Sequence, residues 1–183
     1  MSRFAWCITL TCLALPLRLD AQVNASEPKE RRDAMQKLAF LLGDWSGDAR
    51  RIMGPGRTES FRQTEHVRTA LGGQVFVIDG IGRTLVDGTV GDTAFQAFGV
   101  LDWRPGRGYQ LHSMTHEGRE GFFPVKLLPD GQGLEWGFDV AGGKTRYTLR
   151  LTPDGEWHEQ GEFSSDGQRW IPTVEMRLRR VPR

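Results

Sequence analysis

Apolar and polar residues alternate along most of the chain after residue 43, with the two-residue period of a β-strand that buries one face. The alternation is clearest where Tyr147, Leu149 and Leu151 are separated by polar residues. Clusters rich in Gly, Pro and Asp recur at nearly regular intervals and predict short turns. These turns separate ten predicted strands, near residues 44–53, 58–69, 74–83, 93–103, 108–116, 121–128, 133–140, 144–152, 156–164 and 168–180.

The spacing of apolar residues is different before residue 43, where it has the period of a helix. Ser26 is a suitable N-cap, and Pro28 fits the first turn, where its missing N–H is not needed. Gly43 is a natural stop. The pattern therefore predicts one helix over residues 27–42.

The predicted turns are all short, so each strand is expected to pair with the next one in sequence. A meander of ten strands has two long unpaired edges, and closure into a barrel removes them. The predicted fold class is therefore all-β: an antiparallel up-and-down β-barrel of about ten strands with one N-terminal helix. The chain has 183 residues and no linker-like segment, which predicts one domain.

The N-terminal residues have the composition of a secretory signal. Arg3 is followed by an apolar run, residues 4–17, that is too short to span a membrane. Cleavage is expected after Ala21 or Ala25. We therefore predict a signal peptide at residues 1–25, a mature domain at residues 26–183, and a periplasmic or secreted location. An uncleaved anchor is the alternative. The mature chain has no second apolar run of spanning length.

Cysteine usage and charge restrict the chemistry of the mature chain. Both cysteines, Cys7 and Cys12, lie in the predicted signal, so the mature chain has no disulfide and no thiol nucleophile. The whole chain has a net charge of +1, and the predicted signal contributes that charge, so the mature chain is about neutral. A neutral chain lacks the concentrated basic face that nucleic-acid binding requires. We therefore expect no nucleic acid as a partner.

A Gly-x-Trp sequence, Gly43-Asp44-Trp45, follows the predicted helix and opens the first strand. At this position we expect Trp45 to close one end of the barrel. An arginine of the last strand can stack on such a Trp or bind nearby backbone carbonyl groups, and the candidates are Arg177 and Arg179. Both roles are structural.

Residues 38–47, LAFLLGDWSG, and residues 71–76, LGGQVF, resemble a bacterial family of unknown function with a calycin-like barrel. That barrel is similar in layout to lipocalins, fatty-acid-binding proteins and nitrobindins. The resemblance implies a lipocalin-like domain with an internal cavity, but it implies no reaction. Nitrobindins hold a haem through a histidine near the C-terminus. Here the last strand has no histidine, and the nearest is His158. We therefore predict no cofactor.

The histidines and carboxylates are candidates for a metal site or for a catalytic acid–base pair. His112 and His116 lie on a predicted strand, where four residues span about 13 Å, too far for one metal ion to contact both. No metal site is therefore predicted. A histidine beside Glu65 or Glu159 in a cavity could act as an acid–base pair. We expect the charged residues inside strands, Glu65, Glu135, Asp139 and Glu175, to lie on the outer face.

The leading functional hypothesis is a binding module that holds a small, mainly apolar ligand in the barrel and has no catalytic residues. The expected lining is Phe98, His112, Met114, Trp136 and Tyr147. The alternatives are an enzyme that uses the acid–base pair, and a barrel with a filled core that acts through protein contacts. The sequence fixes neither the ligand nor the oligomeric state, nor which face of each strand points inward.

Overall fold

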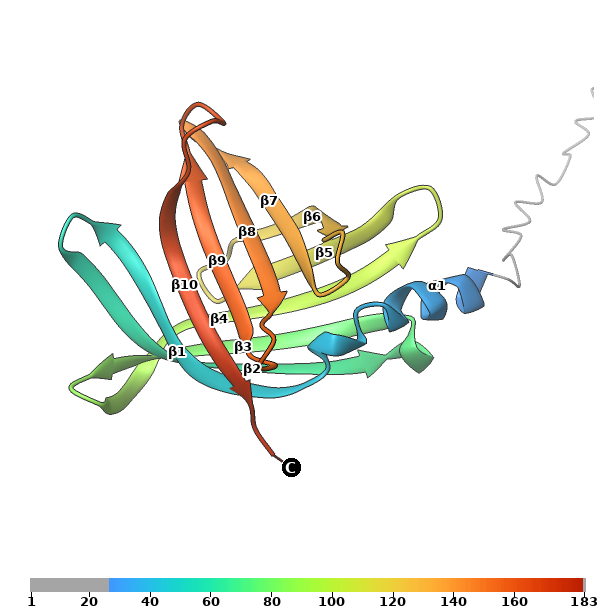
Figure 1. The fold of residues 1–183 in the computed structure, drawn as a ribbon, viewed down its shortest axis with the longest axis horizontal. Helices are drawn as coiled ribbons and strands as arrows, with labels where there is room; N and C mark the ends of the chain where they lie inside the picture. Colours follow the sequence, from blue (N-terminus) through green and yellow to red (C-terminus); the bar gives the residue numbers. More distant parts are fainter. Residues whose placement is uncertain (1–26, 183) are drawn as a thin grey trace, which may run out of the picture.

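The computed structural model describes residues 27–182, so the signal peptide predicted at residues 1–25 lies outside the described residues. Ten antiparallel strands form a closed barrel in which each strand pairs with the next and β1 pairs with β10 (Figure 1). The elements are α1 (Glu27–Gln36), η1 (Ala39–Leu41), β1 (Gly43–Gly54), β2 (Arg57–Ala70), η2 (Leu71–Gly73), β3 (Val75–Val86), β4 (Thr89–Arg104), β5 (Gly108–Thr115), β6 (Glu120–Leu127), β7 (Gly133–Val140), β8 (Gly143–Leu151), β9 (Trp157–Ser164) and β10 (Ile171–Arg180). The predicted fold class is confirmed.

The N-terminal helix is shorter than predicted, because α1 ends at Gln36 and a separate 3₁₀ turn, η1, follows it. The Lys37 amide donates to the Ala34 carbonyl oxygen at 3.1 Å and the Leu38 amide donates to that of Met35 at 2.9 Å. The Tyr109 hydroxyl donates a second hydrogen bond, of 2.8 Å, to the Ala34 carbonyl oxygen. These two i→i−3 bonds end the α-helix in a tighter turn, and the wall residue Tyr109 is hydrogen-bonded to that turn. Among the described residues, no helix has the length and apolar character needed to cross a bilayer.

The β3–β4 hairpin extends beyond the predicted strand ends, to a two-residue turn at Asp87 and Gly88. Both turn residues have positive φ, +48° and +79°, as a tight hairpin turn of this kind requires. The pairing register shifts twice beside Arg83. These irregularities interrupt the two-residue alternation, which explains why the sequence pattern ended the strands too early.

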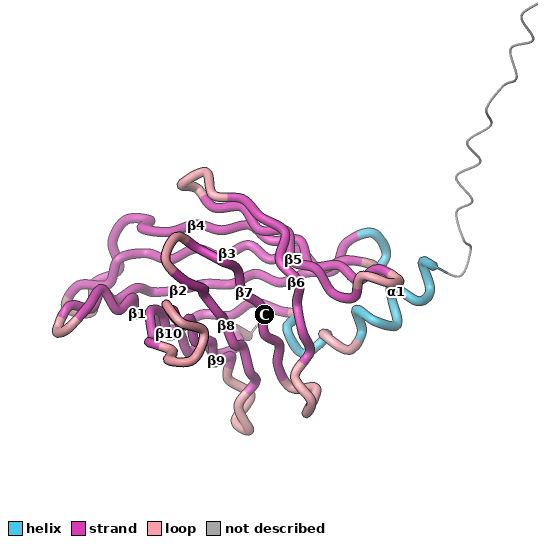
Figure 2. Tube along the Cα trace, turned by 90° about the horizontal axis from the view of Figure 1, so that it is seen from above, coloured by secondary structure: helices cyan, strands magenta, loops and turns pink. Residues whose placement is uncertain are grey.

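The connections alternate between the two ends of the barrel. The β1–β2, β3–β4, β5–β6, β7–β8 and β9–β10 turns belong to one end, which we name the distal end. The opposite end, which we name the helix end, carries α1 and η1 (Figure 2).

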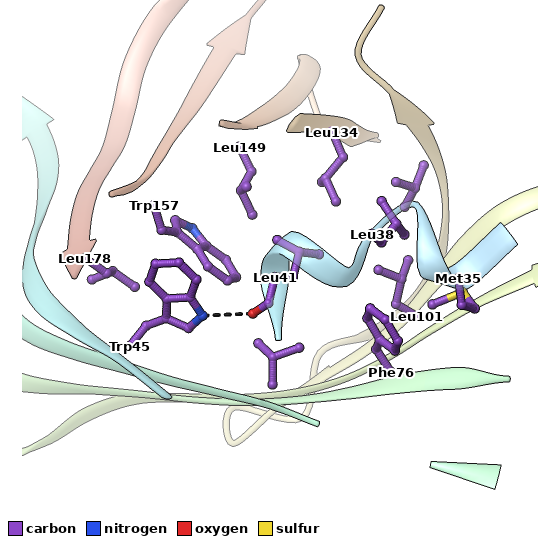
Figure 3. Close-up of a cluster of buried hydrophobic side chains, with 12 residues drawn as sticks. Met35, Leu38, Leu41, Trp45, Phe76, Leu101, Leu134, Leu149, Trp157 and Leu178 are labelled. Carbon is purple, nitrogen blue, oxygen red and sulfur yellow. Dashed lines mark hydrogen bonds between the residues drawn. The ribbon is translucent and has the colours of Figure 1, made fainter. Parts of the chain in front are cut away.

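The hydrophobic core lies at the helix end, where η1 and the residues before it pack into the barrel (Figure 3). Leu38, Leu41 and Leu178 are at most 1% exposed. The Trp45 ring meets the Trp157 ring edge-to-face at 5.6 Å between centroids. Burial of a large apolar side chain contributes about 1.5–3 kcal/mol, so this cluster holds the N-terminal segment in the barrel.

Candidate functional site

The strand register identifies the inner face, because residues paired across an antiparallel ladder project to the same side of the sheet. Trp45 is buried in the core and pairs with Glu65, which in turn pairs with Gly80. Followed around the barrel, the inner face includes Gln63, Glu65 and Val67 of β2, Ala97, Gly99 and Leu101 of β4, Leu111 of β5, Phe123 of β6, Trp136 of β7, Tyr147 of β8 and Glu159 of β9.

Two of the five expected lining residues, Trp136 and Tyr147, lie on the inner face and pair with each other. Phe98, His112 and Met114 lie on the outer face, so the expectation that they line the interior is wrong. The reason is that small residues occupy the inward positions beside them. Inward positions at this level of β4 and β5 are Ala97, Gly99 and Ser113, and the larger residues between them point outward. Side-chain size therefore does not identify the inward residues on this part of β4 and β5.

An aromatic cluster, made of Phe123, Trp136, Phe138 and Tyr147, covers the inner face of β6, β7 and β8. The Trp136 and Tyr147 rings stack with their centroids 4.3 Å apart and their planes 9° apart. Phe123 lies 5.4 Å from the Trp136 centroid and 5.0 Å from the Phe138 centroid. All four side chains point inward, yet all four remain partly exposed. The interior around them is therefore not filled by the core.

Long inward side chains lie flat against glycines on the neighbouring strand. A Cβ on Gly80 would lie 2.7 Å from both carboxylate oxygens of Glu65, and a Cβ on Gly82 would lie 2.8 Å from Oε1 of Gln63. A Cβ on Gly161 would lie 2.8 Å from the Tyr147 ring. The glycines thus let these side chains lie along the wall, which leaves the centre of the barrel free of them.

Two carboxyl groups are buried on the inner face. Glu65 and Glu159 are each 8% exposed. Oε1 of Glu65 accepts a 2.8 Å hydrogen bond from Nε2 of Gln63, and Oε2 of Glu159 accepts a 3.1 Å bond from the Trp157 indole. Burial, followed by repulsion from Glu159, raises the pKa of Glu65 to about 8. Burial also raises the pKa of Glu159 to about 7.

The sequence-based placement of charged strand residues is correct for Glu135, Asp139 and Glu175 but wrong for Glu65. The two-residue period of β2 already indicated that Glu65 points inward. Phe61, Gln63, Glu65 and Val67 share one parity on β2, and Phe61 and Val67 are buried. A carboxylate that alternates in step with buried apolar residues lies on their face of the strand.

The histidines do not approach this pair of carboxyls. His66, His112 and His158 lie on the outer face, where His112 meets Glu120 at 2.7 Å and His158 meets Glu175 at 3.3 Å. His116 follows the end of β5 at the distal end and contacts the backbone of Gln96. The predicted alternative of an acid–base pair between a cavity histidine and a carboxylate is therefore not formed.

Trp45 closes the helix end, but its arginine partner is Arg180 and neither of the two predicted candidates. The Arg180 guanidinium lies 4.1 Å from the Trp45 ring centroid. Arg177 and Arg179 point outward, to Glu175 and Glu156 respectively. The alternation along β10 explains this difference. Arg180 lies on the same face of the strand as the fully buried Leu178, whereas Arg177 and Arg179 lie on the opposite face.

Two surface hollows, of about 450 and 420 Å³, lie beside the β8–β9 turn and the start of β1. Arg180 lines both of them, and neither includes a residue of the aromatic cluster. They therefore belong to the helix end and not to the inner face that carries the aromatic rings and the two carboxyls.

No family model and no curated protein matches the sequence. The fold is similar to the crystal structure of Rv2717c from M. tuberculosis, with 18% identity, 81% of this chain and 98% of that chain covered, and a TM-score of 0.59. It is also similar to the S-type phycobiliprotein lyase CPES from Guillardia theta, with 8% identity, coverage of 86% and 97%, and a TM-score of 0.55. These likenesses support one conclusion, that the chain folds as a calycin-like β-barrel.

Proposed function

We propose that this chain is an exported binding protein that holds a small, mainly apolar molecule inside its barrel and performs no catalysis on it. The observation that carries the proposal is the aromatic cluster, whose four rings point into the barrel and are still partly exposed. At the helix end, by contrast, inward residues such as Leu134 and Leu149 are 5% and 4% exposed. The barrel is thus filled at one end and has uncovered apolar surface beyond it.

Covering that surface supplies the free energy for binding. Burial of apolar area contributes about 25 cal/mol per Å², so a ligand that buries about 200 Å² of it gains about 5 kcal/mol before the entropy cost of binding. The flat stack of Trp136 and Tyr147 offers a preformed apolar surface, because the two rings already support each other. The third hypothesis, a filled barrel that acts through protein contacts, would leave no such surface.

The binding proposal is tested with a neutral apolar dye, N-phenyl-1-naphthylamine, whose fluorescence rises in apolar surroundings. The sequence provides a matched pair of variants, because Phe123 points inward and its neighbour Phe122 is 70% exposed on the outer face. We expect Phe123→Ala to weaken dye binding at least tenfold and Phe122→Ala to leave it within twofold. Equal effects of the two substitutions, or no binding by the wild type, would overturn the proposal.

Export is the second part of the proposal and rests on the composition of residues 1–25. Intact-mass measurement of the protein recovered from the periplasmic and secreted fractions of a bacterial host tests it. We expect a chain that begins after Ala21 or Ala25. A full-length chain confined to the cytoplasm would contradict export and leave the binding proposal standing.

A further inference from the structure

The inner face beside the aromatic cluster has hydrogen-bond acceptors without donors. Among the described residues, no donor reaches Oε2 of Glu65, Oε1 of Glu159 or Oε1 of Gln63. These side chains are 8%, 8% and 6% exposed, so each is more than nine-tenths buried. A buried acceptor without a partner is costly, and three of them in one region call for donors from outside the chain.

The three oxygens are not sealed into the wall. In residues 27–182, no fully enclosed side-chain oxygen or nitrogen lacks a hydrogen-bond partner. Because these three oxygens do lack one, each must adjoin space that a water-sized molecule can reach. They are also neighbours: Gln63 donates to Glu65, and the charge of Glu159 acts on Glu65.

No basic side chain of the described residues pairs with either carboxyl. None of the ion pairs of the barrel includes Glu65 or Glu159. Three strand arginines have the inward parity, and none of them pairs with the two carboxyls. Arg51 lies beside Glu59 and over the Phe61 ring, Arg57 is exposed at the start of β2, and Arg180 lies over Trp45. Without a cation, two buried carboxyls that lie close together favour their neutral, protonated forms, because a buried charge needs a partner.

We propose that the ligand carries a primary ammonium group, which binds between Glu65 and Glu159 with Gln63 while its apolar body lies on the aromatic cluster. This inference rests on the proposed binding function and specifies its ligand class. An ammonium group has three N–H donors and no acceptor, so it matches three acceptors that have no donor. Its positive charge also supplies the counter-ion that allows a buried carboxyl to ionise. A carboxylate or alcohol head group would not provide both.

Binding of such a ligand releases protons. The raised pKa values keep Glu65 protonated and Glu159 partly protonated at pH 7. The amine arrives already protonated, and a buried carboxyl becomes a carboxylate on contact with it and gives its proton to the solvent. About one proton is therefore released per amine bound at pH 7, and affinity rises with pH between about 5 and 8.

The experiment compares three ligands of equal chain length, decylamine, decan-1-ol and decanoate, as competitors of the dye on the full mature protein. We expect decylamine to bind at least tenfold more tightly than the other two at pH 7.5 and to lose at least tenfold in affinity at pH 5. Calorimetry in two buffers of different ionisation enthalpy should show about one proton released. No proton release, or equal affinity for the three ligands, would overturn the ammonium site.

The variants separate the head-group site from the apolar site. Glu65→Gln with Glu159→Gln should abolish the preference for decylamine and keep decan-1-ol binding, while the control Glu135→Gln, on the outer face, should keep the preference. Proton release by the wild type tests the site even if the double variant does not fold. If the three ligands bind equally, only the ammonium site fails. If none of them binds and the dye does not bind either, the proposed function itself fails.

Discussion

The Arg180 guanidinium lies over the Trp45 ring, 4.1 Å from its centroid, and joins the last strand to the first. The same group donates to the Phe40 carbonyl oxygen at 2.7 Å and to that of Leu42. The Trp45 indole donates to the Leu41 carbonyl oxygen at 2.8 Å. Three carbonyl groups at the end of η1 thus receive their donors from these two residues, and this arrangement closes the helix end.

Loss of the arginine should therefore destabilise the barrel. We expect Arg180→Ala to lower the free energy of unfolding by about 1–3 kcal/mol, because it removes a cation–π contact and two hydrogen bonds to backbone oxygens. Arg179→Ala is the matched control: its side chain is 82% exposed and its surface ion pair is worth about 0–1 kcal/mol. Urea denaturation measures both. A larger loss for the Arg179 variant would refute this role of Arg180.

The contact between Glu65 and Gly80 gives a second prediction. Gly80→Ala would place a methyl group against the carboxyl, whose oxygens lie 2.7 Å from the Cβ position. We expect a loss of about 1–3 kcal/mol, as for other overpacked sites. Glu65→Ala in the Gly80→Ala background should cost less than Glu65→Ala alone, which a thermal double-mutant cycle measures. Additive effects would show that the two residues are not in contact.

The buried carboxyls should make stability depend on pH. The pKa values of Glu65 and Glu159 in the folded chain, about 8 and 7, lie above the ordinary value of 4.5. Between these values the folded state holds more protons than the unfolded state, so stability falls as pH rises from about 5 to 8 and levels off above that.

The expected slope is about 2 kcal/mol per pH unit between pH 5 and 7, because two groups contribute. Urea denaturation of the empty protein at pH 5, 6, 7 and 8 measures it. The double variant Glu65→Gln and Glu159→Gln serves as the control and should show a flatter profile. A flat or rising profile in the wild type would show that the pKa values of the two carboxyls are not raised in the folded chain.

The fold could be predicted from sequence, because turn residues at regular spacing and two-residue alternation are local signals that do not depend on which face is buried. The site could be predicted only in part. Trp136 and Tyr147 were placed correctly, but Phe98 and Met114 were expected inside because they are large, whereas this barrel points alanine and glycine inward on β4. A wall of small residues has no distinctive composition, since the same glycines also suit turns.

Glu65, which the sequence analysis placed on the outer face, and Arg180, which it did not name, could both have been found from parity. Each alternates with buried apolar residues on its own strand. Residue type led to the opposite expectation, because charged side chains usually point to water. The missing information was a reason to bury a charge, and the free oxygens around the carboxyl pair now suggest one, a ligand that supplies the donors.

The location of the ligand is tested most directly by the indole N–H signals in an NMR titration with decylamine. Trp136 lies on the inner face in the aromatic cluster, whereas Trp170 lies beside Arg146, on the outer side of β8. The account predicts that the Trp136 signal shifts in proportion to the bound fraction and that the Trp170 signal does not move. A shift of Trp170 with an unchanged Trp136 would contradict binding inside the barrel.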